Sequence, residues 1–217
     1  MLECRSEAIK PPYQTGTIHA ILGKESMQTL KKTFVPQKLS SCSARAKFFS
    51  RAGISAVVLF ALALPAGAEP TAIGTFKDWS VYSSGSGKDK VCYALAQPKS
   101  SEPKKVKRDP IFFLISTWPG RNVRDEPSVV PGYTFREGAK VGIEVGSDKF
   151  ELFTKNEGDV GGAWMENADD EKRLIDAMQR GSGMFVTGTS ARGTLTRDTY
   201  SLGGIKAALD KVGATCK

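Results

Sequence analysis

The C-terminal part of the chain consists mainly of short runs in which apolar and polar residues alternate. In the run KVGIEV at 140–145 every second residue is Val or Ile, as in a strand with one buried face. The run IFFLI at 111–115 is apolar at every position, which predicts a strand buried on both faces. Turn residues separate these runs, which together predict strands over residues 76–82, 91–96, 111–115, 140–145, 150–153, 184–189 and 194–202.

Two segments have the period of a helix instead. Asn167 is a good N-cap for a helix over about 168–180, and acidic residues follow in its first turn. In a second helix, over about 204–212, apolar residues recur at i, i+3, i+4 and i+7, and Gly213 is expected to end it. About seven strands with two short helices predict a mainly β domain, either an antiparallel β-sandwich or a barrel-like sheet.

The N-terminal part of the chain carries an export signal. Residues 52–64 contain no charge, three Lys or Arg residues closely precede them, and Ala-Gly-Ala follows at 66–68. This order is typical of a signal peptide cleaved after Ala68, so the mature protein is expected to begin at Glu69. The apolar run lacks a preceding Arg-Arg pair, which favours the general secretory route.

Two points about the leader stay open. An uncleaved membrane anchor is the alternative to a signal peptide, although a spanning helix needs roughly 20 apolar residues. The start of translation is either Met1 or Met27. The predicted organisation is therefore a leader over residues 1–68 and one domain over 69–217, with no integral membrane span in the mature form.

The basic charge belongs mostly to the leader. The chain has a formal net charge of +8, yet residues 1–68 carry nine Lys and Arg against three acids, and residues 69–217 carry 22 against 20. Because the predicted mature domain is almost balanced, its charge gives no support to nucleic-acid binding.

Two cysteines, Cys92 and Cys216, follow the leader. In an oxidising compartment two cysteines are enough for one disulfide, and Cys216, as the penultimate residue, would tether the C-terminus. Two separate buried thiols are the alternative.

The domain lacks the side chains of several common chemistries. The only histidine, His19, lies in the leader, which excludes Ser-His-Asp and Cys-His nucleophiles and His-ligated metals from the domain. We therefore predict no catalytic, cofactor-binding or metal-binding residues. Paired carboxylates remain an alternative, since glycoside hydrolysis needs only two; the candidates are Asp78, Glu144, Glu166 and Asp198.

The segment 98–110 (PKSSEPKKVKRDP) is predicted to be a long polar loop. Its basic residues suit contact with an acidic partner or anionic lipid headgroups, and a merely solvated loop is the alternative. The candidate contact residues are Lys104, Lys105, Lys107 and Arg108.

The domain resembles the invasion-associated locus B family of exported proteins of Gram-negative bacteria. The resemblance is carried, in order, by DWSVY at 78–82, VCYAL at 91–95, IFFLIS at 111–116, AW at 163–164, GTSARGT at 188–194, DTYSLGG at 198–204 and Cys216. It implies a mainly β protein of the periplasm or associated with the outer membrane, with some members linked to host-cell invasion. It implies no catalytic residues, and of the family's cysteine pairings only Cys92 with Cys216 is available here.

These observations favour a non-enzymatic envelope protein that binds a partner: an envelope or cell-surface protein, or a host-cell surface. The alternatives are a carbohydrate-active enzyme using paired carboxylates and a small-ligand carrier with a pocket inside the sandwich. A closed core with exposed loops at 98–110 and 121–127 is expected for the binding protein. An open cleft with two carboxylates would favour the enzyme, and a deep apolar cavity would favour the carrier.

Overall fold

A computed structural model describes residues 69–217 of the chain. The predicted leader, its apolar run at 52–64 and its last residue, Ala68, lie outside the described residues. Glu69, the predicted first residue of the mature protein, lies two residues before the first strand.

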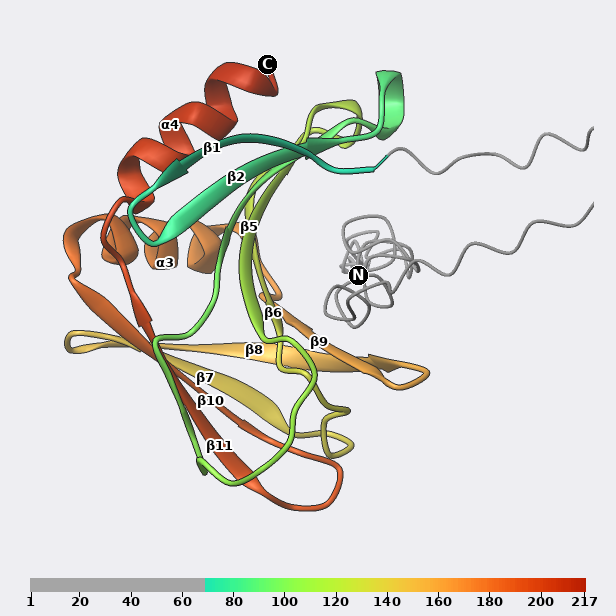
Figure 1. Cartoon of the computed structure of the whole chain (residues 1–217), viewed down its shortest axis with the longest axis vertical. Coiled ribbons are helices and arrows are strands. Elements are labelled where there is room, and N and C mark those ends of the chain that lie inside the picture. The colour runs from blue at the N-terminus through green and yellow to red at the C-terminus, as the bar shows by residue number, and fades with distance from the viewer. Residues whose placement is uncertain (1–68) are drawn as a thin grey trace, which may run out of the picture. The chain divides into compact units, whose positions relative to one another are not determined.

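The described residues form eleven strands in one antiparallel sheet (Figure 1). Along the sheet the order is β1-β2-β3-β5-β6-β9-β8-β7-β10-β11-β4, so β1 and β4 are the edge strands. The strands are β1 (Thr71–Phe76), β2 (Trp79–Ser84), β3 (Val91–Ala96), β4 (Ser100–Glu102), β5 (Phe112–Trp118), β6 (Val123–Val130), β7 (Lys140–Val145), β8 (Asp148–Glu157), β9 (Val160–Trp164), β10 (Gly183–Thr189) and β11 (Leu195–Ser201). Short 3-10 turns lie at η1 (Gly87–Asp89) and η2 (Pro119–Arg121).

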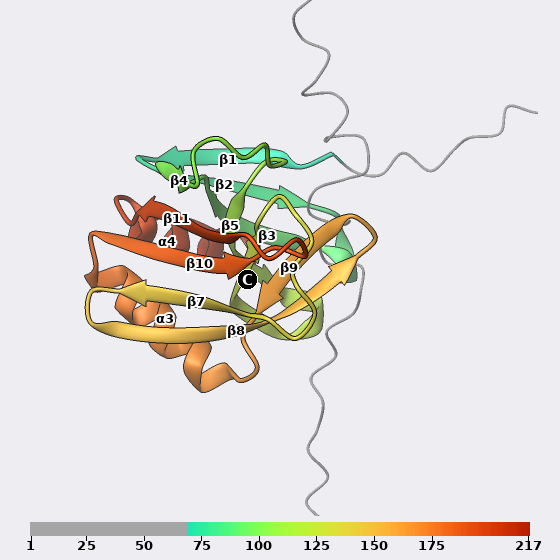
Figure 2. The same cartoon turned by 90° about the horizontal axis from the view of Figure 1, so that it is seen from below.

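The sheet is strongly curved, and two α-helices pack against it (Figures 1 and 2). The helix α4 (Ile205–Thr215) packs on β1, β2 and β3, and α3 (Ala168–Arg180) packs on β6 and β8. The apolar stripes of both helices enter the same core as the inward residues of the strands. The mainly β class with two short helices is confirmed.

Several predicted elements have the expected bounds. The strand 91–96 is β3, and its small residues, Cys92 among them, face the core. The helix 168–180 is α3, where the Asn167 side chain accepts a hydrogen bond from the backbone N–H of Asp170, as an N-cap should.

Other boundaries were wrong. The predicted strand 76–82 is broken by a turn at Lys77, whose φ of 53° is left-handed, so it contributes to both β1 and β2. Gly213 does not end the second helix, because α4 continues to Thr215 and the N–H of Cys216 still bonds to the Val212 carbonyl. The expected loop at 121–127 is mostly strand, since β6 begins at Val123.

The predicted disulfide joins Cys92 on β3 to Cys216 at the end of α4. The two Cα atoms are 5.8 Å apart, within the usual range for a disulfide, and both residues are completely buried. The alternative of two separate thiols is thereby overturned.

Candidate functional site

The segment 98–110 links β3 to its neighbour β5, and on the way it crosses to the far edge of the sheet, where β4 lies beside β11. After β3 ends at Ala96, the Lys99 N–H donates to the Thr199 carbonyl at 2.7 Å, and β4 then pairs with β11. The predicted loop is therefore strand over Ser100–Glu102, and only the residues beyond Glu102 project as a loop.

Arg108 does not project with the lysines of this loop. Its guanidinium donates two hydrogen bonds of 2.7 Å to the Asp198 carboxylate, and the two side chains are only 6% and 3% exposed. It also donates to the Pro131 carbonyl at 2.9 and 2.6 Å and lies over the Tyr133 ring, 4.9 Å from its centre. Arg108 is thus unavailable to a partner, and its assignment as a contact residue is corrected to a structural one.

A layer of polar side chains surrounds this ion pair. The Tyr133 hydroxyl lies 2.7 Å from the Thr196 hydroxyl, which donates to the Gly188 carbonyl. The buried Tyr200 hydroxyl has no hydrogen-bond partner among the described residues. Burial, and then the nearby Asp198 charge, raise the pKa of Tyr200 well above its usual value. This tyrosine is therefore neutral and adds no further charge beside the ion pair.

Three loops meet above the ion pair and hold one another by backbone hydrogen bonds. The Asp109 N–H donates to the Gly132 carbonyl at 3.0 Å, and the Arg136 N–H donates to the Thr189 carbonyl at 3.0 Å. The Ala191 N–H donates to the Thr134 carbonyl at 2.8 Å. The contact at Gly132 needs a glycine, because its φ is +73° and a side chain would collide with the Asp109 carbonyl.

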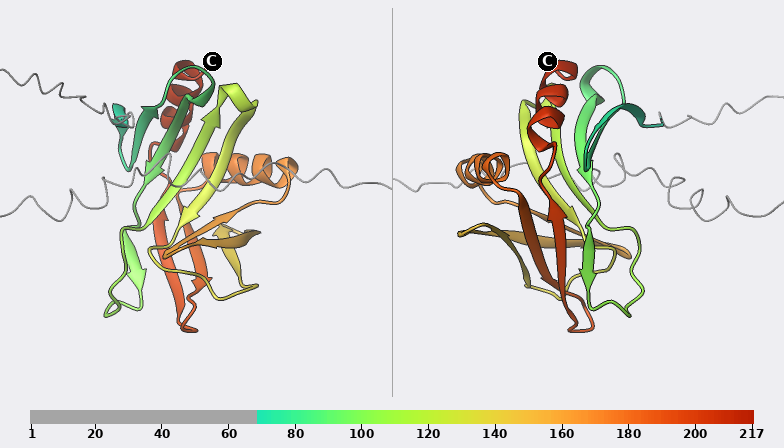
Figure 3. Two further views of the ribbon diagram at one scale, coloured as in Figure 1. Left: turned by 90° about the vertical axis from the view of Figure 1, so that its right-hand side faces the viewer. Right: turned by 60° about the vertical axis from the view of Figure 1, so that its left-hand side comes forward.

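These loops lie at the end of the domain away from α4 (Figures 1 and 3), and they carry a group of exposed cations. We call it the basic loop end, defined by Lys104, Lys105, Lys107, Arg136 and Arg192, which are all exposed. Within residues 69–217 none of the five forms an ion pair. The exposed acids on the same loops are Asp109 and Glu137, so positive charge is in excess.

The four carboxylates named from the sequence occupy different surroundings. Asp78 pairs with Lys99 and Asp198 with Arg108, while Glu144 lies 3.4 Å from Lys149 and 3.6 Å from Arg197. Glu166 lines a groove between β8 and the start of α3. Three of the four are therefore held by their own cations.

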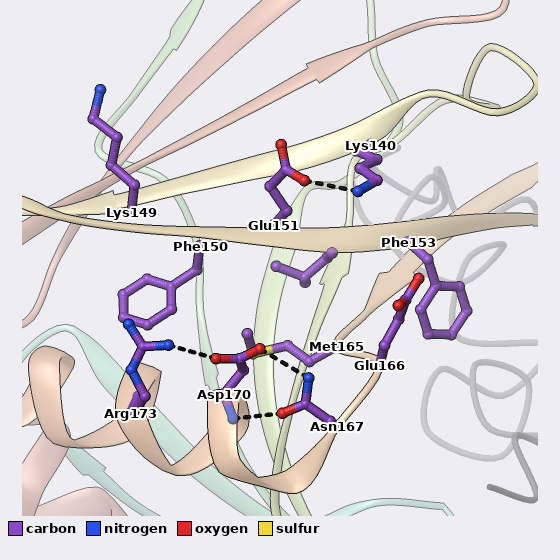
Figure 4. A pocket seen from close by; sticks show the side chains of 11 residues that line it. Lys140, Lys149, Phe150, Glu151, Phe153, Met165, Glu166, Asn167, Asp170 and Arg173 are labelled. Atoms are coloured by element: carbon purple, nitrogen blue, oxygen red, sulfur yellow. Dashed lines mark hydrogen bonds and ion pairs between the residues drawn. The ribbon is translucent and has the colours of Figure 1, made fainter. Parts of the chain in front are cut away.

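The groove beside Glu166 has a volume of about 280 Å³ and is open and polar (Figure 4). Lys140 pairs with Glu151 at 2.8 Å across one wall, and Arg173 pairs with Asp170 at 2.6 Å across the other. Its charges are matched within the groove. It is thus neither a deep apolar cavity nor a cleft with two free carboxylates.

Two further carboxylates were missed from the sequence. Glu126 on β6 and Glu171 on α3 interact electrostatically, and burial raises the pKa of both. Burial first, and then the Glu126 charge, raise the pKa of Glu171 to about 7. No periodicity marks this pair, because it forms only where α3 packs on β6.

Glu171 makes a pH-dependent contribution to stability. Its pKa is higher in the folded state than the usual 4.5, so the folded state binds the extra proton and stability falls as pH rises from about 4.5 to 7. We expect Glu171→Gln to raise the free energy of unfolding by about 1 kcal/mol at about pH 8, after allowance for solvent screening, with no gain at about pH 5.

Urea unfolding at both pH values measures this effect. Asp169→Asn is the matched control, since Asp169 is an exposed acid in the same helical turn. A gain for Glu171→Gln that is equal at both pH values, or equal to that of the control, would contradict the assignment.

All three tryptophans of the domain, Trp79, Trp118 and Trp164, are buried. The Trp79 indole N–H donates to the Ser201 carbonyl at 3.1 Å, and Arg121 covers the Trp118 ring at 4.4 Å. Their rings are used for packing and offer no open face for a sugar.

Within residues 69–217 no group of three His, Cys, Asp or Glu residues is placed to hold a metal ion. No helix of the described region is both long and apolar enough to cross a bilayer.

The fold and the basic loop end define a class: a mainly β domain of one curved antiparallel sheet, closed by two helices and a disulfide, with charged loops at one end. The family model described as invasion associated locus B (IalB) protein matches residues 79–213, and the chain belongs to this family. The resemblance drawn from the sequence motifs is thereby confirmed.

Among solved structures, the chain is similar to the crystal structure of invasion associated protein B from Bartonella henselae. The identity is 16%, the match covers 65% of this chain and 96% of the other, and the TM-score is 0.46. No curated protein matches the chain.

Proposed function

We propose that the protein is a non-enzymatic envelope protein that recognises a partner through the basic loop end. The observation that carries the proposal is a group of five exposed cations, without ion pairs among residues 69–217, on three loops that backbone hydrogen bonds hold together. Binding residues are often carried on loops fixed by a rigid sheet, and pre-ordering lowers the entropy lost on binding.

Family membership and the disulfide support an extracytoplasmic location. A bridge such as Cys92–Cys216 persists in an oxidising compartment, which is the environment expected after removal of a signal peptide. We propose the periplasm, reached by the general secretory route, with association at the outer membrane. The family name adds a context of host-cell invasion, which we propose as the setting in which the partner is met.

The enzyme and carrier alternatives have less support. The carboxylates that line the groove include Glu151 and Asp170, and each of these is bound to a neighbouring cation. Catalysis of glycoside hydrolysis needs one carboxylic acid and one free carboxylate on either side of a substrate. The core is filled by side chains of the sheet and both helices, which leaves the carrier without a supporting observation.

Photo-crosslinking in intact cells tests the proposal. A photoreactive residue at Ala191, an exposed position at the tip of the β10–β11 turn, captures neighbours without depending on lysine chemistry. We expect a reproducible crosslinked species that is lost in the triple variant Lys104→Ser/Lys105→Ser/Lys107→Ser.

The matched control removes three exposed lysines from η1 and α4, at the opposite end of the domain: Lys88→Ser/Lys206→Ser/Lys211→Ser (Figure 1). The crosslink should survive in this control. Either of two results would contradict the proposal. One is an unchanged crosslink in the first triple variant; the other is turnover of a peptidoglycan fragment by the purified protein, abolished by one Asp or Glu substitution.

A further inference from the structure

Exposed apolar side chains accompany the cations at the basic loop end. Three large apolar residues are exposed within 69–217: Val106 at 36%, Phe185 at 38% and Leu195 at 69%. Phe185 is covered by Arg197, whose guanidinium lies 4.0 Å from its ring centre. Val106 lies on the loop after β4 and Leu195 is the first residue of β11, both at the basic loop end, and Leu195 is the most exposed of the three.

The strand register brings these two apolar residues to the same edge. β4 pairs antiparallel with β11, with Glu102 opposite Arg197, so the residues after Glu102 continue toward the start of β11, where Leu195 lies. The turn that follows is closed by a hydrogen bond from the Val106 N–H to the Pro103 carbonyl. Val106 is therefore held in a turn, between Lys105 and Lys107, that follows the end of β4 lying beside the start of β11.

The remaining cations lie on the adjoining loops. Arg192 is three residues before Leu195, in the β10–β11 turn, and the Arg136 guanidinium lies beside Gly193 of the same turn. In the views of Figures 1 and 3 the β10–β11 turn and the loop after β4 project from the same end of the domain, away from α4. The result is an apolar tip bordered by cations.

We propose that this end docks on the surface of an anionic lipid bilayer. Leu195 and Val106 enter the boundary between headgroups and acyl chains, and the five cations contact the headgroups. The inference rests on the basic loop end as the contact surface of the proposed function and names its partner.

Two features favour a bilayer over a protein partner. Lysine is depleted in protein–protein interfaces, where Arg and aromatic residues are enriched, yet three of the five cations are lysines. A protruding leucine bordered by flexible cations instead has the two components of interfacial membrane binding, buried apolar area and attraction to anionic lipid.

Vesicle flotation tests the inference with the protein purified from the envelope fraction. The vesicles are phosphatidylcholine alone, and phosphatidylcholine mixed with phosphatidylglycerol. We expect binding to the mixed vesicles only. Removal of the loop lysines in Lys104→Ser/Lys105→Ser/Lys107→Ser should weaken this binding about 100-fold, and Leu195→Ser should weaken it about 5- to 10-fold.

The control variant Lys88→Ser/Lys206→Ser/Lys211→Ser has the same change of net charge and should bind within about threefold of the unmodified protein. Equal loss in both triple variants would overturn the inference, as would equal or absent binding to both kinds of vesicle. Loss in the loop variant with full binding by Leu195→Ser would point to a soluble polyanion and overturn it too. If vesicle binding is absent while the lysine-dependent crosslink to a protein persists, only this inference fails and the proposed function stands.

Discussion

Reduction of the Cys92–Cys216 bridge should lower the melting temperature of the domain by about 5–15 °C and leave it folded at room temperature. The bridge joins residues 124 positions apart. In the chain-entropy account a loop of this length is worth about 4–5 kcal/mol, and measured disulfides typically give about 2–4 kcal/mol. For a domain of about 150 residues, each kcal/mol changes the melting temperature by about 2–4 °C.

The fold should persist because other contacts hold the C-terminal helix. The buried face of α4 consists of Ile205, Ala208, Leu209 and Val212. In addition, the Lys90 ammonium donates to the Thr215 carbonyl at 2.8 Å. Reduction therefore removes a constraint on the unfolded chain more than a contact of the folded one.

Thermal unfolding monitored by circular dichroism, with and without reductant, measures the shift. The variant Cys92→Ala/Cys216→Ala is the control: reductant should have no effect on it, and its melting temperature should lie near that of the reduced protein. Alkylation should label neither cysteine before reduction. Free labelling of both thiols in protein isolated from the envelope would rule out the bridge.

Elements determined by local sequence could be predicted. α3 has an N-cap, acids in its first turn and a basic residue, Arg180, in its last, so capping and dipole effects agree with its apolar stripe. β3 alternates small and large residues between two turns and was predicted with its observed bounds. The mainly β class follows from such elements, since seven of the strands have local patterns.

The missed strands depend on distant partners. Pro127 lies in β6, where it pairs with Ile115 of β5, but the pairing of β6 with β9 is confined to Ser128 and Val129. A proline is tolerated there because no ladder hydrogen bond to β9 is lost. β9 contains two glycines and β4 has only three residues, so neither has a recognisable strand pattern in the sequence. Only the sheet as a whole selects these segments as strands.

The candidate contact surface could be predicted only in part. The three loop lysines were predicted from the segment in which they lie, and they are exposed. Arg108 lies in the same segment but is buried, because it pairs with Asp198, which is 90 residues away. Arg136 and Arg192 were missed for a related reason: the backbone hydrogen bonds that join their loops form only after β7, β10 and β11 pair. The sequence shows which of these residues are charged, but it does not show which of them the fold buries.

Removal of one partner of the Arg108–Asp198 ion pair should destabilise the domain by about 3–5 kcal/mol. Both side chains are almost completely buried, so Asp198→Leu or Arg108→Met leaves the other charge desolvated and without its partner. Replacement of both by apolar residues of similar size, Arg108→Met/Asp198→Leu, should recover most of the loss, because no buried charge remains. Urea unfolding of the four proteins gives the coupling free energy between the two positions.

The same cycle separates stability from the arrangement of the loops. Arg108 is bonded to Pro131 as well as to Asp198, so it fixes the loop after β4 to the loop before β7. In Arg108→Met/Asp198→Leu these bonds are absent even where stability has recovered, and trypsin should cleave at Lys104, Lys105 and Lys107 faster than in the unmodified protein. Asp210→Asn, an exposed change on α4, should alter neither stability nor cleavage. Additive losses in the two single variants would mean that the pair does not stabilise the fold as a unit. Unchanged cleavage in the double variant would mean that the pair does not order the basic loop end.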